Sequence, residues 1–138
     1  MLQTFEKVKS VAPTKTTVLL LGDTGVGKGM VAKLIHQHSS RKDEAFVHVH
    51  CGALPDTLVE SELFGYEKGA FTGATQSSPG KFELAQGGTL LLDEVTEMDI
   101  ALQAKLLRVI QERQVERLGA RQAIRLDVRI IATSNRDI

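Results

Sequence analysis

A glycine-rich segment near the N-terminus limits the possible folds more than any other part of the chain. Residues 22–28 read Gly-Asp-Thr-Gly-Val-Gly-Lys, the pattern G-x-x-x-x-G-K, and they follow a short apolar run at residues 18–21. Apolar side chains then recur at positions 30, 31, 34 and 35, which is helical spacing. Glycines in this pattern let backbone N–H groups point at phosphate oxygens, while the helix N-terminus and Lys28 add positive charge. The segment therefore predicts a phosphate-binding loop between a strand and a helix.

This assignment predicts nine positions that contact a nucleotide. They are Gly22, Asp23, Thr24, Gly25, Val26, Gly27, Lys28, Gly29 and Met30. A serine or threonine usually follows the lysine of this pattern and ligates Mg²⁺, but Gly29 stands there. We therefore expect the Mg²⁺ of a bound nucleotide to depend on other ligands and on water. The alternative interpretation is an ordinary glycine-rich turn with a solvated lysine.

Strand-like and helix-like segments alternate along the chain. Strands are predicted at residues 18–21, 46–49, 89–92 and 128–132, helices at 30–38, 57–64 and 101–113, a loop at 65–80 and a hairpin at 114–126. Strands separated by helices predict an α/β fold, with a parallel sheet flanked by helices and right-handed crossovers. With the phosphate-binding loop, this is the architecture of a P-loop NTPase.

Two carboxylates follow the third predicted strand. Asp93 and Glu94 come directly after three leucines, at the strand end where ligands bind in open α/β sheets. Asp93 is positioned to hold Mg²⁺, and Glu94 to accept a proton from an attacking water. Asn135 belongs to a polar group after the fourth strand and could hydrogen-bond the γ-phosphate. The alternatives are an acid pair that only ends the strand and a capping turn at Asn135.

Composition narrows the class of protein. The 138 residues suit one domain, and 17 basic residues balance 17 acidic ones, so no net field favours nucleic acid or a membrane. The longest apolar run has four residues, too short to span a bilayer, and we expect a cytoplasmic domain without membrane contact. His48, His50 and the single Cys51 suggest a zinc site, but they lack a fourth ligand and the usual spacing, so a buried thiol is the simpler interpretation of Cys51.

One segment is much more specific than these patterns. Residues 69–74 read Gly69, Ala70, Phe71, Thr72, Gly73 and Ala74, and with residues 62–68 they resemble the GAFTGA signature of the sigma-54-dependent transcriptional activators, the NtrC-like branch of AAA+ ATPases. Residues 22–28, 87–94, 105–112 and 128–135 are similar to the same family. The resemblance covers residues 16–138, and segments 64–68 and 80–83 are similar to flagellar regulators.

The resemblance implies a function for the chain and its loops. It implies ATP and Mg²⁺ as cofactors, and hydrolysis that remodels the sigma-54 RNA polymerase holoenzyme so that transcription starts. Residues 69–74 would contact sigma-54, and the hairpin at 114–126 would move with them. An exposed Phe71 between glycines is costly in water, which suits a loop that docks a protein partner.

The resemblance also implies a domain organisation for the complete protein. Residues 1–15 are expected to be a lead-in or linker, and 16–138 the α/β part of the sigma-54 interaction domain, truncated before the helical lid. The family's arginine fingers, sensor II arginine and DNA-binding domain would follow residue 138. Family members form rings, so we expect self-association in the complete protein and almost no hydrolysis by this segment alone.

Two residues depart from the family pattern. Gly29 stands where the family generally has Glu, and His50 where it usually has an Asn that engages the strand-end glutamate. His50 could still hydrogen-bond Glu94. These departures keep two alternatives open, a non-hydrolysing nucleotide-binding regulatory module and a P-loop ATPase that remodels another partner.

Overall fold

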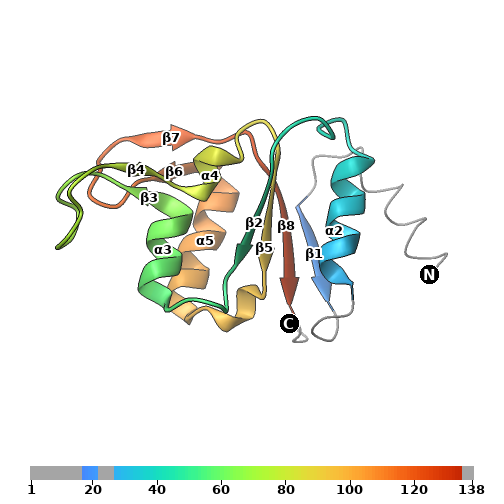
Figure 1. Cartoon of the computed structure of the whole chain (residues 1–138), viewed down its shortest axis with the longest axis horizontal. Helices are drawn as coiled ribbons and strands as arrows, with labels where there is room; N and C mark the ends of the chain where they lie inside the picture. The colour runs from blue at the N-terminus through green and yellow to red at the C-terminus, as the bar shows by residue number, and fades with distance from the viewer. Residues whose placement is uncertain (1–16, 22–26, 135–138) are drawn as a thin grey trace.

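Parallel strands form the centre of the chain, of which the computed structural model describes residues 17–21 and 27–134. The main sheet contains β1 (Val18–Leu21), β2 (Phe46–His50), β5 (Thr89–Asp93) and β8 (Arg129–Ser134). Its strand order is β1-β8-β5-β2, and every pairing is parallel. All four predicted strands and the parallel sheet are therefore confirmed. Figure 1 shows the strands running side by side, with their C-terminal ends at one edge.

Helices cover both faces of this sheet. Helix α2 (Lys28–Gln37) lies on one face, and α3 (Asp56–Phe64) and α5 (Ile100–Glu112) lie on the other (Figure 1). The three predicted helices are confirmed, each within two residues of its expected start and one of its expected end. Asp99 caps the N-terminus of α5, and its carboxylate accepts a 2.7 Å hydrogen bond from the Leu102 N–H. Arg113 caps the C-terminus of α5 and has a left-handed backbone with φ 55°.

The apolar run in β5 follows from burial on both faces. Leu90 and Leu92 pack in the cluster that includes α3 and α5, whereas Leu91 packs with Ala32 and Ile35 of α2. Alternate residues of a strand face opposite sides, so a strand covered on both sides needs apolar residues at every position. No helix in the described part of the chain is both long and apolar enough to cross a bilayer.

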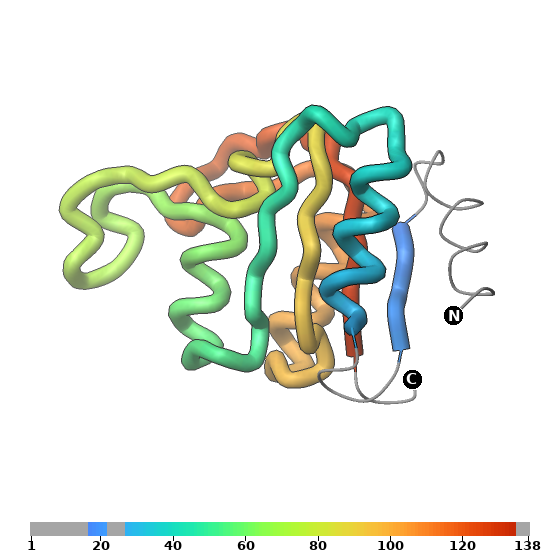
Figure 2. Tube along the Cα trace, turned by 45° about the vertical axis from the view of Figure 1, so that its right-hand side comes forward, coloured from blue at the N-terminus to red at the C-terminus, as the bar shows by residue number. Residues whose placement is uncertain are grey.

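The segment predicted as a loop has more structure than expected. Its ends pair as β3 (Gly65–Tyr66) and β4 (Ser78–Pro79), followed by the short helix α4 (Lys81–Leu84). The predicted hairpin is confirmed as β6 (Gln114–Glu116) paired with β7 (Ala123–Arg125). Figures 1 and 2 show the residues between β3 and β4 projecting from the α3 side, away from the strand ends of the main sheet.

The hairpin is attached to the base of this projecting loop. The Leu118 N–H donates to the Gly65 carbonyl and the Glu67 N–H donates to the Leu118 carbonyl, each at 2.9 Å. Arg117 donates to both carboxylate oxygens of Glu83 in α4, at 2.8 and 2.9 Å, and to Glu67 at 3.2 Å. The Arg117 hydrogen bonds hold the pKa of Glu83 below its ordinary value. One arginine therefore joins the hairpin, the loop base and α4.

Replacing Arg117 with alanine is expected to lower the free energy of unfolding by about 1–3 kcal/mol, because it leaves a largely buried carboxylate without its charged partner. The pKa of Glu83 is held down only in the folded state. The loss of unfolding free energy should therefore be largest above the ordinary Glu83 pKa of 4.5. It should disappear as the pH falls through the lower pKa of Glu83 in the folded state. Urea denaturation at neutral and acid pH measures both.

The matched control is Arg108→Ala, which removes an exposed pair with Glu112 one helical turn away. That change should lower the free energy of unfolding by no more than about 0.5 kcal/mol. Equal losses of unfolding free energy in the two variants would show that the Arg117 contacts contribute no more to stability than an exposed ion pair does.

Candidate active site

Lys28 lies where three elements of the fold meet. Helix α2 begins at this residue, directly after Gly27, whose left-handed backbone has φ 72°. The side chain is buried, and its Nζ donates a 3.1 Å hydrogen bond to the Ser134 carbonyl at the end of β8. The same Nζ lies 4.0 Å from Glu94 Oε1. The predicted strand before the loop and the predicted helix after it are thus confirmed, while residues 22–26 of the expected nucleotide loop lie outside the described residues.

Gly29 and Met30 occupy the first turn of α2. A Cβ atom added to Gly29 would have no atom of the described residues within 4 Å. Met30 is 68% exposed and is not part of the core. The predicted contact of these two residues with a nucleotide stays a prediction.

Thr133 holds the two acidic residues in place. Its hydroxyl donates to Asp93 Oδ1 and accepts a 2.9 Å hydrogen bond from the Glu94 N–H. Thr133 is fully buried near the end of β8, the strand that pairs with β5. Burial alone would raise the pKa of Asp93. Hydrogen bonds from Thr133 and His48, and the charges of His48 and His50, outweigh that effect and hold the pKa below its ordinary value.

Glu94 has an unusual conformation. It is one of two residues other than glycine with positive φ in the described chain, with φ 61° and ψ 52°. Such a backbone costs a residue with a Cβ atom about 1–2 kcal/mol. Its Oε2 atom is buried and has no hydrogen-bond partner among the described residues. The site therefore holds a glutamate with a strained backbone and one buried carboxylate oxygen that has no partner among the described residues.

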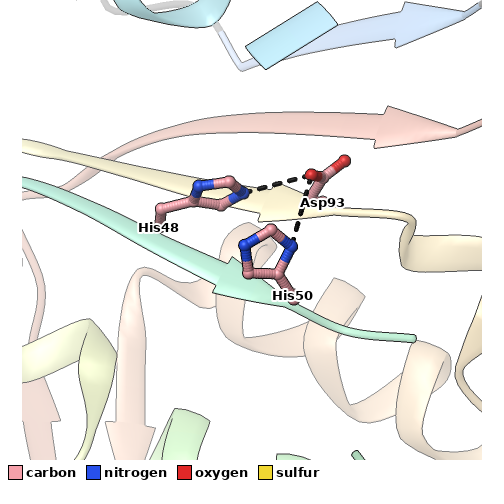
Figure 3. A group of neighbouring side chains, drawn as sticks. All are labelled: His48, His50 and Asp93. Atoms are coloured by element: carbon pink, nitrogen blue, oxygen red, sulfur yellow. Dashed lines mark hydrogen bonds and ion pairs between the residues drawn. The ribbon is translucent and has the colours of Figure 1, made fainter. Parts of the chain in front are cut away.

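The histidines of β2 lie beside Asp93 (Figure 3). His48 Nε2 is 3.1 Å and His50 Nδ1 is 3.6 Å from Asp93 Oδ2. The sequence left open a hydrogen bond from His50 to Glu94, and the structure instead pairs His50 with Asp93. The reason is register, because His50 lies directly opposite Asp93 in the β2–β5 pairing.

Cys51 is not part of this histidine group. The residue is 1% exposed, and its Sγ lies 3.9 Å from the Val49 carbonyl. Burial, and then the charge of Asp93, raises the pKa of the thiol to about 12. Cys51 is therefore an inert buried thiol, as the simpler interpretation predicted.

The polar end of β8 lies at the sheet edge, as expected, but the sequence did not predict the partners of Thr133 and Ser134. Thr133 orients both acids, and Ser134 accepts from Lys28 through its carbonyl and pairs through its hydroxyl with Thr96 at 2.8 Å. Asn135, the predicted γ-phosphate contact, lies outside the described residues. The sequence held only part of this signal: parallel strands end at the same sheet edge, but the order that places β8 beside β5 comes from the structure.

The hexapeptide at residues 69–74 lies apart from these groups. Phe71 is 45% exposed, as predicted, and its ring meets the Tyr66 ring edge-on with centroids 5.0 Å apart. A turn is closed by the Gly69 N–H, which donates to the Ala74 carbonyl at 2.9 Å. A Cβ added to Gly119 of the hairpin would lie 2.9 Å from the Ala70 Cβ, so the hairpin tip packs closely against the hexapeptide.

A buried lysine at the start of the helix after β1, facing two acids at the C-terminal edge of a parallel sheet, defines a P-loop NTPase of the α/β class. The whole chain, residues 1–138, matches the family model of the Sigma-54 interaction domain. The chain belongs to that family.

Known proteins with similar sequences or structures agree with this assignment. The response regulator protein FleR of Pseudomonas aeruginosa is 55% identical over 136 residues, 99% of this chain and 29% of that protein. The crystal structure of NtrX from Brucella abortus matches with a TM-score of 0.90 at 37% identity, covering 99% of this chain and 30% of that one. The P-loop NTPase domain of a sigma-54 activator from E. coli shares the fold, with a TM-score of 0.60 at 20% identity over 96% of this chain and 84% of that one. This chain spans less than a third of FleR and NtrX.

Replacing Thr133 with valine is expected to raise the pKa of Asp93, because the variant keeps the shape of the side chain and loses the hydrogen bond to the carboxylate. Carboxyl NMR during an acid titration measures this pKa directly. Thr133→Ser is the matched control and should keep the wild-type value, since it retains the hydroxyl. An unchanged pKa in the valine variant would mean that the histidines alone stabilise the Asp93 carboxylate.

Proposed function

We propose that this chain is the ATP-binding and hydrolysing core of a bacterial enhancer-binding activator, which remodels the sigma-54 RNA polymerase holoenzyme so that transcription starts. The convergence of Lys28, Asp93 and Glu94 at one sheet edge carries the proposal. Family membership and the exposed hexapeptide support it. A structure of NtrX from Brucella abortus in complex with ATP also matches this chain, with a TM-score of 0.88 at 37% identity.

The described residues fit a nucleotide with Mg²⁺. Lys28 provides a cation at the N-terminus of α2, where a helix favours anions. Asp93 has a pKa below its ordinary value and is therefore ionised, so it would hold Mg²⁺, which when bound would neutralise charge on the phosphates. The oxygen of Glu94 without a partner would accept a proton from an attacking water. Asn135 and the residues of the loop at 22–26 would complete the phosphate contacts.

The hexapeptide would contact sigma-54. Phe71 and Thr72 are exposed on the projecting loop, which lies away from the sheet edge that holds Lys28 and Asp93 (Figure 1). A partner bound there would not block the nucleotide. The contacts of the hairpin with Gly65, Glu67 and Ala70 support joint movement of the hairpin and the loop.

Catalysis in the complete protein would require a ring. In P-loop enzymes, an arginine finger supplied by a neighbouring subunit increases the rate of hydrolysis by about 10³–10⁵-fold. We therefore expect the 138-residue segment to bind ATP weakly and to hydrolyse it very slowly. DNA binding would belong to another domain, and a polymerase partner implies the cytoplasm as the place of action.

In the complete protein, Glu94→Gln is expected to keep ATP binding and to lower turnover by about 10²–10⁴-fold, because the amide preserves shape but cannot accept a proton. Phosphate release at saturating ATP measures this. Lys28→Ala is the comparison variant, and it should instead weaken binding of a fluorescent ATP analogue. Wild-type turnover by the Gln variant would remove Glu94 from the chemistry, and no turnover by the wild type would favour a non-hydrolysing module.

Phe71→Ala is expected to leave ATP hydrolysis at the wild-type rate and to abolish sigma-54 binding and transcription activation. The reason is position, since the side chain is exposed and remote from Lys28 and the acids. Thr72→Ala should behave in the same way. Leu107→Ala, which removes a 54% exposed apolar side chain from α5, is the matched control and should affect neither readout. Parallel loss of hydrolysis in the Phe71 variant would indicate a structural role for the loop.

A further inference from the structure

Three side chains with metal-binding atoms lie on one face of the main sheet. Phe46 of β2 packs on the α2 side, while Val47 and Val49 pack on the other, so the alternation of the strand places His48 and His50 on the α2 side. Leu91 of β5 also packs on the α2 side, which places Asp93 there as well. The backbone itself therefore brings the two imidazoles and the carboxylate together.

The distances suit a single ion. His48 Nε2 and His50 Nδ1 lie 3.1 and 3.6 Å from Asp93 Oδ2, and all three atoms lie within 4.8 Å of one another. Ligands at about 2.0–2.1 Å from a tetrahedral zinc ion are roughly 3.3 Å apart. Figure 3 shows a ring nitrogen of each histidine directed at the Asp93 carboxylate, and both nitrogen–oxygen distances are close to that spacing.

The surroundings resemble those of a metal site with an open position. The Asp93 Oδ1 atom is held by the Thr133 hydroxyl, which leaves Oδ2 directed at the histidines. Hydrogen bonds of this kind orient ligating carboxylates in metal sites. The side chains of His48, His50 and Asp93 are 31%, 63% and 21% exposed, so an ion and its waters can reach them.

We propose that His48, His50 and Asp93 bind a divalent transition-metal ion of the zinc type. Two imidazoles and one carboxylate favour such ions, whereas Mg²⁺ prefers oxygen ligands alone. Three protein ligands leave at least one coordination position for water or for an oxygen of another ligand. Cys51 is not a ligand, because its thiol is buried beside the Val49 carbonyl.

The proposed site has a consequence that rests on the proposed function of Asp93. The carboxylate that would hold Mg²⁺ for hydrolysis is the same one that would ligate the transition metal. Occupation by zinc would direct Asp93 towards β2 and withdraw it from the nucleotide. The ion would therefore inhibit ATP hydrolysis, and the two histidines would make the protein sensitive to it.

The direct test uses the protein without nucleotide. Titration with Co²⁺ should produce the visible absorption of a cobalt ion in a low-coordinate nitrogen and oxygen site, and Zn²⁺ should abolish it by displacement. His48→Gln and His50→Gln should each weaken Co²⁺ binding by at least about 10-fold, since even loss of an outer hydrogen bond costs about 10–100-fold in metal sites. Circular dichroism of each variant checks the fold.

His38→Gln is the matched control. It removes one of the four histidines of the chain, an exposed one at the end of α2, and should leave Co²⁺ binding unchanged. Absence of the cobalt spectrum in the wild type, or equal binding by the His48 and His50 variants, would overturn the metal site. The three residues would then form only a hydrogen-bonded group.

A second experiment tests the inhibition of ATP hydrolysis separately from metal binding. ATP hydrolysis by the complete protein is measured at buffered free Zn²⁺, with each variant compared with its own zinc-free rate. Zinc should inhibit the wild type and the His38 variant and have little effect on the His50 variant at the same concentration. Metal binding without inhibition would support the metal site and refute the inference that zinc withdraws Asp93 from the nucleotide. Absence of hydrolysis without zinc would refute the proposed function and leave the cobalt result standing.

Discussion

The parallel pairing of β5 with β8 is the constraint on which the site depends. Its register places the end of β8 beside the end of β5, so Thr133 contacts both Asp93 and the Glu94 backbone. The next residue, Ser134, then offers its carbonyl to Lys28. Leucine and isoleucine side chains of these strands pack into buried clusters on both faces of the sheet, and this packing holds the two strands together.

A second set of contacts connects the projecting loop to the rest of the molecule. Backbone hydrogen bonds join Gly65 and Glu67 to Leu118, and Arg117 ties the same hairpin to α4 through Glu83. The loop thus projects from an anchored base. Its exposed Phe71 packs against Tyr66 of β3 and belongs to the loop that projects away from the strand edge with Lys28 and Asp93.

The sequence predicted the fold well because its signals are local. Continuous leucines, helical spacing and the glycine pattern identified all four main strands, three helices and the hairpin. It predicted the side-chain partners less well. The sequence left open a hydrogen bond from His50 to Glu94, yet strand register sets its partner as Asp93, and register depends on contacts between strands far apart in the chain. The contacts of Thr133 with the acids were missed for the same reason, since they appear only when β8 is placed beside β5.

The conformation of Glu94 supports the proposal that the acid pair takes part in chemistry over the alternative that it only ends the strand. A residue that merely ended a strand would relax into an allowed backbone and direct its carboxylate to water. Glu94 instead keeps a left-handed backbone and a buried oxygen without a partner among the described residues, both of which cost free energy. Thr133 and the core beneath β5 hold it in this state. Strain maintained beside a buried lysine, at the ligand-binding edge of the sheet, is expected of a residue placed for chemistry.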